Sequence, residues 1–178
     1  MPQHRAGDLW PIVRLIGDSV AVVAVNSARP NPQPWRSSGI IPAEQIEALA
    51  RILRDPAVRE RFVFVITHYA PRLADGRPDR YTHGLVNADA LLSVCADLPR
   101  GAILHGHVHR CFSVRVPGVR PPLFGAGSTT QDQREGLWLF EIDADGMRAV
   151  RGAWDGDRYV LTADEVRVEH PRRFLATA

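Results

Sequence analysis

Three short and almost uniformly apolar runs dominate the hydrophobic pattern of the chain: residues 20–25 (VAVVAV), 62–66 (FVFVI) and 102–104 (AIL). Runs of this length without polar alternation are typical of strands covered on both faces. An apolar segment at residues 12–16 precedes the first run, and the Gly17-Asp18 pair between them predicts a β-hairpin. The pattern therefore predicts a sheet in which residues 62–66 form the central strand.

Helical periodicity is found in two segments that separate these runs. Pro42 is expected to open the first helix as a first-turn proline, and Asp55-Pro56 to break it before a brief second helical turn. Asn87 is expected to cap the second helix, over residues 88–98. A strand, helix, strand succession predicts an α/β fold with parallel strands.

From residue 111 onward the pattern changes to β. Successive strands are expected at residues 112–116, 123–126, 137–142 and 147–154, and a further short one at residues 159–161. We expect one domain over residues 12–162, without an internal boundary, and a polar, frayed tail over residues 163–178. A single domain of this size can bury a core of its own.

Composition excludes some classes of protein. The net charge of +2 does not favour a nucleic-acid or membrane surface built on bulk charge, although all 22 basic residues are arginine. The start of the chain lacks the apolar core of a signal peptide, and no apolar stretch approaches the roughly 18–20 residues of a membrane span. Cys95 and Cys111 suggest a reducing compartment, with a single disulfide left open. We therefore expect a cytoplasmic protein.

Histidines follow two of the apolar strands. His68 comes after residues 62–66, and the stretch GAILHGHVH places His107 and His109 after residues 102–104. In an extended chain His107 and His109 would face the same side, and parallel strands joined by a helix would bring His68 to the same sheet edge. Neutral imidazole binds several first-row metals, so we expect His68, His107 and His109 to be metal ligands.

The other histidines have simpler expected roles. His105 is expected to pack at the strand end or to hydrogen-bond locally. His83, beside Gly84 in a loop, is expected to be a solvated or capping residue, and His4 and His170 lie in expected tails.

These residues carry a resemblance to a known family. His68 after one apolar strand and Gly106-His107-Val108-His109 after the next resemble the C-terminal half of the calcineurin-like metallophosphoesterases. The NADALLSVCAD helix, the LFGAGSTT segment and VAVVAVNSARP followed by IIPAEQ are similar too, the last resembling bacterial members that include cyclic-nucleotide phosphodiesterases. The resemblance covers residues 12–151. It implies the C-terminal part of a four-layer α/β/β/α sandwich, with a β-rich C-terminal segment.

The resemblance also implies chemistry. Members of the family hydrolyse phosphoric esters with a metal-activated hydroxide at a site of two divalent ions, such as Mn, Fe or Zn. By position, His68 and His107 would bind one ion and His109 the other. The family's Asp-x-His, Gly-Asp and Gly-Asn-His elements are missing from this sequence, because Gly7-Asp8 and Gly17-Asp18 lie in a tail and a hairpin turn.

This departure limits the metal site. Two divalent ions about 3.5–4 Å apart repel strongly without a bridging carboxylate or hydroxide, and imidazoles offset none of that charge. A single ion held by three histidines can still activate water. The sequence therefore leaves three hypotheses: a metal-dependent phosphoesterase incomplete as this chain, a non-catalytic metal-binding or interaction module, and a mononuclear zinc hydrolase. A phosphoester substrate is expected, and self-association or a partner protein is expected to cover an exposed sheet edge.

Overall fold

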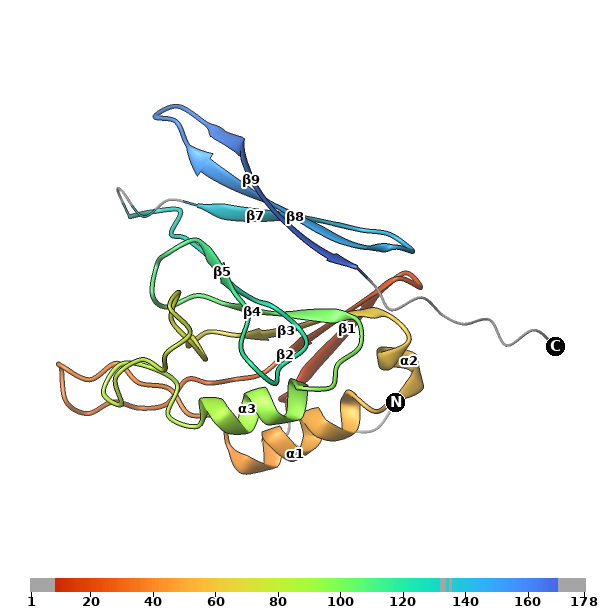
Figure 1. The fold of residues 1–178 in the computed structure, drawn as a ribbon. Helices are drawn as coiled ribbons and strands as arrows, with labels where there is room; N and C mark the ends of the chain where they lie inside the picture. The colour runs from red at the N-terminus through yellow and green to blue at the C-terminus, as the bar shows by residue number, and fades with distance from the viewer. Residues whose placement is uncertain (1–8, 132–133, 135, 170–178) are drawn as a thin grey trace.

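The structure, a computed structural model, describes residues 9–131, 134 and 136–169. Its elements form two sheets and three helices (Figure 1). The strands are β1 (Ile12–Ile16), β2 (Val20–Ala24), β3 (Phe62–Thr67), β4 (Gly101–His105), β5 (Phe112–Val114), β6 (Leu123–Gly125), β7 (Leu137–Ile142), β8 (Gly146–Trp154) and β9 (Tyr159–Glu169). The helices are α1 (Ala43–Ile52), α2 (Pro56–Arg59) and α3 (Ala88–Cys95). None of the helices described is long and apolar enough to cross a membrane.

The larger sheet has six strands in the order β1-β2-β3-β4-β6-β5. β1 and β2 form the predicted antiparallel hairpin, with Gly17 at φ +53° in its turn, while β2, β3, β4 and β6 run parallel. β3 is central and nearly all buried, as its continuous apolar sequence predicts. Because β3 and β4 are adjacent and parallel, their carboxyl ends lie at the same sheet edge.

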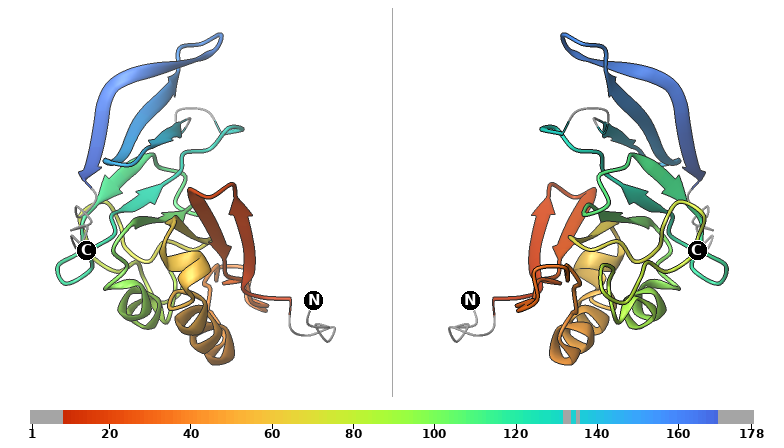
Figure 2. Two further views of the ribbon diagram at one scale, coloured as in Figure 1. Left: turned by 90° about the vertical axis from the view of Figure 1, so that its right-hand side faces the viewer. Right: turned by 90° about the vertical axis from the view of Figure 1, so that its left-hand side faces the viewer.

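The helices α1 and α3 cover one face of this sheet, as the views in Figure 1 and Figure 2 show. Between helices and sheet lies the larger core cluster, which includes Val23, Leu49, Val65, Leu91 and Ile103. Pro42 is the N-cap of α1 rather than its first helical residue.

Asn87 precedes α3 but does not cap it with its side chain. Its amide instead donates to the Ile41 carbonyl at 2.7 Å and accepts from the Ile41 N–H at 3.0 Å. Asn87 therefore occupies the predicted N-cap position, but its amide satisfies a buried backbone segment outside its own helix instead of the helix N-terminus.

The three-stranded sheet β7-β8-β9 packs on the other face of the larger sheet. The smaller core cluster, with Phe64, Phe124, Met147 and Ala149, fills the space between the two sheets. The described residues thus form helix, sheet and sheet layers, and the predicted α/β class with a β-rich C-terminal segment is confirmed. The fourth, helical layer of the predicted sandwich is not found among the described residues.

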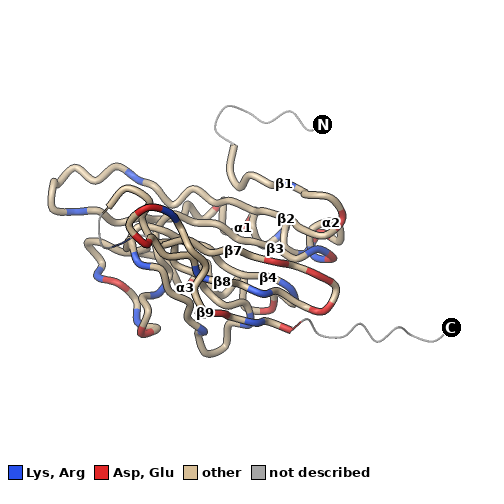
Figure 3. The backbone as a smooth tube through the Cα atoms, turned by 90° about the horizontal axis from the view of Figure 1, so that it is seen from above, with Lys and Arg blue, Asp and Glu red and all other residues tan. Residues whose placement is uncertain are grey.

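The predicted tail at residues 163–178 needs correction, because β9 continues to Glu169. Val166 and Val168 pack on the core between the sheets, and the alternating charged residues face outward, where Glu165 pairs with Arg148 at 2.8 Å. The polar residues of this segment are therefore the solvent face of a strand. Figure 3 shows acidic and basic residues interspersed along the chain. Cys95 and Cys111 are free thiols.

Candidate metal site

The ends of β3 and β4 position the two central histidines. Thr67 pairs with His105 in the parallel register, and the Gly106 N–H donates to the His68 carbonyl at 3.0 Å. This hydrogen bond joins the two loops directly after their strands. The ring centroids of His68 and His107 lie 5.3 Å apart, so the expectation that these two histidines meet at one sheet edge is confirmed.

The backbone at His107 is unusual. Its φ is +67°, and the Val108 N–H donates to the Gly106 carbonyl at 2.8 Å, which closes a three-residue γ-turn around His107. His109 follows at φ +49°, and in the described part of the chain these two histidines are the non-glycine residues with positive φ. The extended geometry assumed from the sequence is wrong here. Left-handed non-glycine residues cost about 1–3 kcal/mol each and cluster at functional sites.

The two left-handed histidines have different surroundings. His109 is bonded through Nδ1 to Gln131 Oε1 at 2.6 Å. The His107 ring packs on Tyr69 and on His83, each at a centroid distance of 4.3 Å, and its Nε2 is buried without a hydrogen-bond partner among the described residues. Burial, followed by the neighbouring His83 and His68, lowers the pKa of His107 to about 4. The ring is therefore neutral at pH 7, the form that binds metals.

His83 contacts this cluster, although its side chain is 45% exposed and is thus partly solvated as expected. Its Nδ1 lies 2.5 Å from Asp79 Oδ2, and the side chain of Asp79 is only 10% exposed. Sequence reasoning missed the pair because a loop folds His83 onto a turn far along the chain. The i, i+4 spacing of Asp79 and His83 was the available signal.

His105 has the local role predicted for it. It is 3% exposed, its Nδ1 lies 3.3 Å from the Gly106 carbonyl oxygen, and its ring packs on Phe112. Burial lowers the pKa of His105 to about 4, so it stays neutral inside the fold. His4, His170 and Gly7-Asp8 lie outside the described residues.

Within the described ranges, no group of three or more His, Cys, Asp or Glu side chains is arranged to hold a metal ion. The question is therefore whether the individual ring nitrogens of the histidines are free to bind a metal ion. His107 Nε2 is a buried nitrogen without a partner, and His68 is an exposed imidazole beside it. Imidazole nitrogens of this kind are donors that first-row divalent ions accept.

A cavity of about 420 Å³ adjoins this cluster. Its lining includes Asp79, His83, His107, Arg110 and Arg134. The size lies in the range of about 300–1,000 Å³ found for small-molecule sites. The two guanidinium groups lie in a lining that also contains the carboxylates of Asp75 and Asp79.

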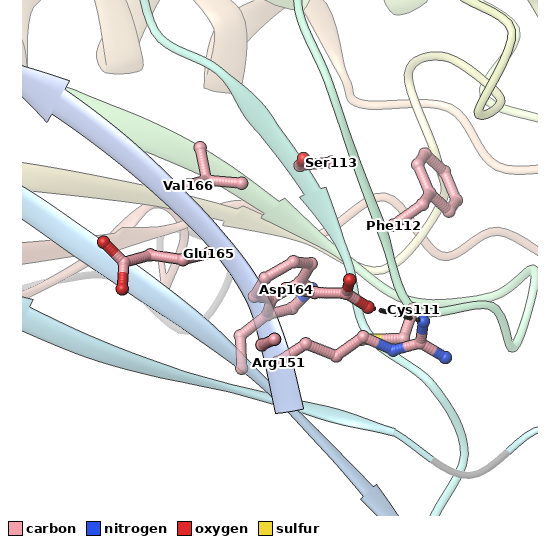
Figure 4. A pocket seen from close by; sticks show the side chains of 9 residues that line it. Cys111, Phe112, Ser113, Arg151, Asp164, Glu165 and Val166 are labelled. Atoms are coloured by element: carbon pink, nitrogen blue, oxygen red, sulfur yellow. Dashed lines mark hydrogen bonds and ion pairs between the residues drawn. The ribbon is translucent and has the colours of Figure 1, made fainter. Parts of the chain in front are cut away.

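A second cavity, of about 430 Å³, lies between β5 and the three-stranded sheet (Figure 4). Figure 4 shows the Arg151 guanidinium beside Asp164 and Cys111, and Arg151 pairs with Asp164 at 3.3 Å. Burial raises the pKa of the Cys111 thiol, which makes it a poor nucleophile. This cavity lacks the histidines of the first.

Comparison with known proteins gives a fold and not a sequence family. No protein-family model and no curated protein matches the sequence. Among solved structures, the chain is similar to a dimetal phosphatase from Danio rerio at 13% identity and a TM-score of 0.52, over 73% of this chain and 38% of that one. The chain thus spans well under half the length of that phosphatase.

The fold is accordingly similar to that of this dimetal phosphatase. Two structures of Vps29 from Entamoeba histolytica, one a single mutant and one complexed with Zn²⁺, are further matches. The single mutant is 16% identical with a TM-score of 0.35, and the match covers 84% of this chain and 99% of the Vps29 chain. The Zn²⁺ complex is 14% identical with a TM-score of 0.34, and the match covers 83% of this chain and 98% of the Vps29 chain.

Proposed function

We propose that the protein binds a divalent metal ion through His68 and His107 and hydrolyses phosphoesters in the adjoining cavity. The observation that carries this proposal is the setting of His107. Its Nε2 is buried and unpartnered, its backbone is held in a left-handed turn, and His68 lies beside it at the carboxyl edge of the sheet. Strain and an unsatisfied nitrogen at one residue favour a ligand over a purely structural role.

The bound ion would supply Lewis-acid chemistry, which polarises a phosphoryl oxygen and lowers the pKa of water. Arg110 and Arg134 would orient the phosphate, because a guanidinium group matches two phosphate oxygens at once. Phosphodiesters are the substrates to test first, since the N-terminal part of the sequence resembles the phosphodiesterase-like members.

The alternative is a non-catalytic metal-binding or interaction module. It is favoured by the donor set: the carboxylate in the cluster, Asp79, is bonded to His83, and the predicted ligands are all neutral imidazoles. Without a bridging carboxylate these residues do not fit two adjacent divalent ions. A mononuclear site is thus the form that the present side chains support.

Equilibrium dialysis against Zn²⁺ or Mn²⁺, paired with hydrolysis of bis(p-nitrophenyl) phosphate, tests both proposals. The phosphoesterase predicts metal binding and turnover, both lost in His107→Gln. It also predicts that Arg110→Ala raises KM several-fold, whereas Arg158→Ala, in the distant β8–β9 turn, leaves KM unchanged. Metal binding without turnover supports the module. Absence of metal binding overturns the phosphoesterase and the metal-binding form of the module, and leaves the interaction module.

A further inference from the structure

We propose that the protein forms a two-fold dimer in which β1 pairs antiparallel with β1 of a second copy, with Leu15 at the two-fold axis. The six-stranded sheets of the two copies then join into one continuous sheet, an arrangement in which both copies use the same surface. This inference is independent of the proposed metal site, because it concerns the sheet edge formed by β1 and not the loops that carry the histidines.

β1 is an open edge of the larger sheet. It is the first strand in the order β1-β2-β3-β4-β6-β5, so one side of its backbone has no neighbouring strand within the described ranges. Its pairing with β2 is regular over all five residues, without a bulge that would twist the edge away. The opposite edge strand, β5, has only three residues. Exposed edges are usually protected by shortness, bulges, charged residues or proline, and β1 carries a single charged side chain, that of Arg14.

Apolar side chains of β1 are exposed on both faces of the sheet. Val13 packs on the core beneath the helices, and Leu15 points to the same face but is 48% exposed. Ile16 pairs with Val20, which packs on the core between the two sheets, yet Ile16 is 59% exposed. In Figure 2 the β1–β2 hairpin stands at the side of the molecule, beside the helices and clear of the three-stranded sheet. Neither layer therefore covers β1, and a flat apolar strand meets solvent.

The charges near β1 favour a second copy as the partner of this edge. With Leu15 opposite Leu15 of the second copy, Arg14 lies opposite Ile16 and diagonal to Asp18 of that copy. Diagonal neighbours in antiparallel strands lie about 7–8 Å apart, within reach of a long side chain. Arg14 has no ion-pair partner in the part of the chain that the structure describes, and the side chain of Asp18 is fully exposed although it lies 3.4 Å from Arg61.

Two-fold symmetry forms this ion pair twice. The two Arg14 side chains are themselves diagonal neighbours across the axis, and the two Asp18 carboxylates offset their repulsion. The register shifted by one residue along each strand would place Arg14 directly opposite Arg14 of the second copy, and like charges in that position are destabilising. The charges thus select the register with Leu15 at the axis.

Sedimentation equilibrium of the full chain in EDTA, over a wide range of protein concentration, tests the dimer. We expect wild type and His107→Gln to dimerise equally, because the metal site is not involved. Leu15→Lys should weaken dimerisation at least about 10-fold by placing two like charges at the axis, whereas Leu161→Lys, at a leucine of β9 that is 57% exposed, should change it less than about 2-fold. A wild-type protein that is monomeric at every concentration, or a dimer insensitive to Leu15→Lys, would overturn the proposal.

A charge exchange tests the register. Arg14→Asp and Asp18→Arg should each weaken dimerisation several-fold, and the double variant should restore it, because the pair re-forms with its charges exchanged. A double variant as weak as the two single changes combined would overturn the assigned register.

Hydrogen exchange shows whether the backbones pair. The amides of β1 should become more protected as protein concentration rises, whereas those of β5, at the opposite edge, should not. A dimer that leaves the protection of β1 unchanged would overturn strand pairing. Circular dichroism that matches wild type checks that each variant remains folded.

Discussion

The left-handed turn at His107 can be tested by comparing two substitutions that remove the same ring. His107→Ala and His107→Gly both delete the imidazole and its contacts with Tyr69 and His83, so these losses cancel in the comparison. The two variants differ in the free-energy cost of holding residue 107 at φ +67°. For an L-residue this conformation costs about 1–2 kcal/mol, whereas glycine adopts it freely.

Glycine also lowers the free energy of unfolding by about 0.4–1 kcal/mol, because the unfolded chain has more conformational freedom at a glycine. The expected net result is that His107→Gly is more stable than His107→Ala by about 0.5–1 kcal/mol, or roughly 2–3 °C in Tm for a domain of this size. Urea unfolding in EDTA, followed by circular dichroism and tryptophan fluorescence, measures the difference.

The control is an exposed helical position with ordinary geometry. Ala90→Gly in α3 should lower stability by about 1 kcal/mol, the usual order of alanine above glycine. If His107→Ala is as stable as His107→Gly while Ala90→Gly behaves normally, the turn is not left-handed. The argument from strain to function would then be refuted.

Two further predictions concern buried polar groups. The pKa of His105 falls from 6.5 unfolded to about 4 folded, so the unfolded chain binds more protons between these values and stability should fall as pH drops from about 6.5 to about 4. Between pH 6.5 and pH 4 the difference in free energy of unfolding between wild type and His105→Phe should change by about 3 kcal/mol. If the two proteins lose stability equally over this range, His105 is not a buried neutral ring. Asn87→Asp should lower the free energy of unfolding in urea by about 1–2 kcal/mol, because an aspartate cannot donate to the Ile41 carbonyl. Unchanged stability would indicate that residue 87 acts as a helix cap, a role that Asp fills equally well.

The sequence predicts most of the fold because its strands carry local signals. The continuous apolar runs of β3 and β4 and the apolar segment of β7 identify their strands almost residue for residue. β9 is underestimated because its charged residues resemble those of a tail, and only the paired Arg148 and the core beneath Val166 make it a strand. Such support comes from residues distant in the sequence, which a local pattern does not contain.

The same distinction applies to the site. His68 and His107 follow predictable strands, so parallel topology is enough to bring them together. The contact of His83 with His107 depends on the path of a long loop. The γ-turn depends on the hydrogen bond from the Gly106 N–H to the His68 carbonyl. Neither feature has a local periodicity, so neither could be predicted from the sequence pattern.

The proposed metal ion would offset the free-energy cost of placing a histidine at position 107. A glycine at this position would adopt the turn without the roughly 1–2 kcal/mol cost to an L-residue, and it would leave no buried ring nitrogen unpaired. A histidine here lowers the stability of the ligand-free fold twice over, through its backbone and through Nε2. A ligand that binds only the folded chain and is present at 100 times its Kd adds about 2.7 kcal/mol of stability. That gain exceeds the cost of the turn, so an imidazole in this turn is favourable overall once its free nitrogen coordinates an ion.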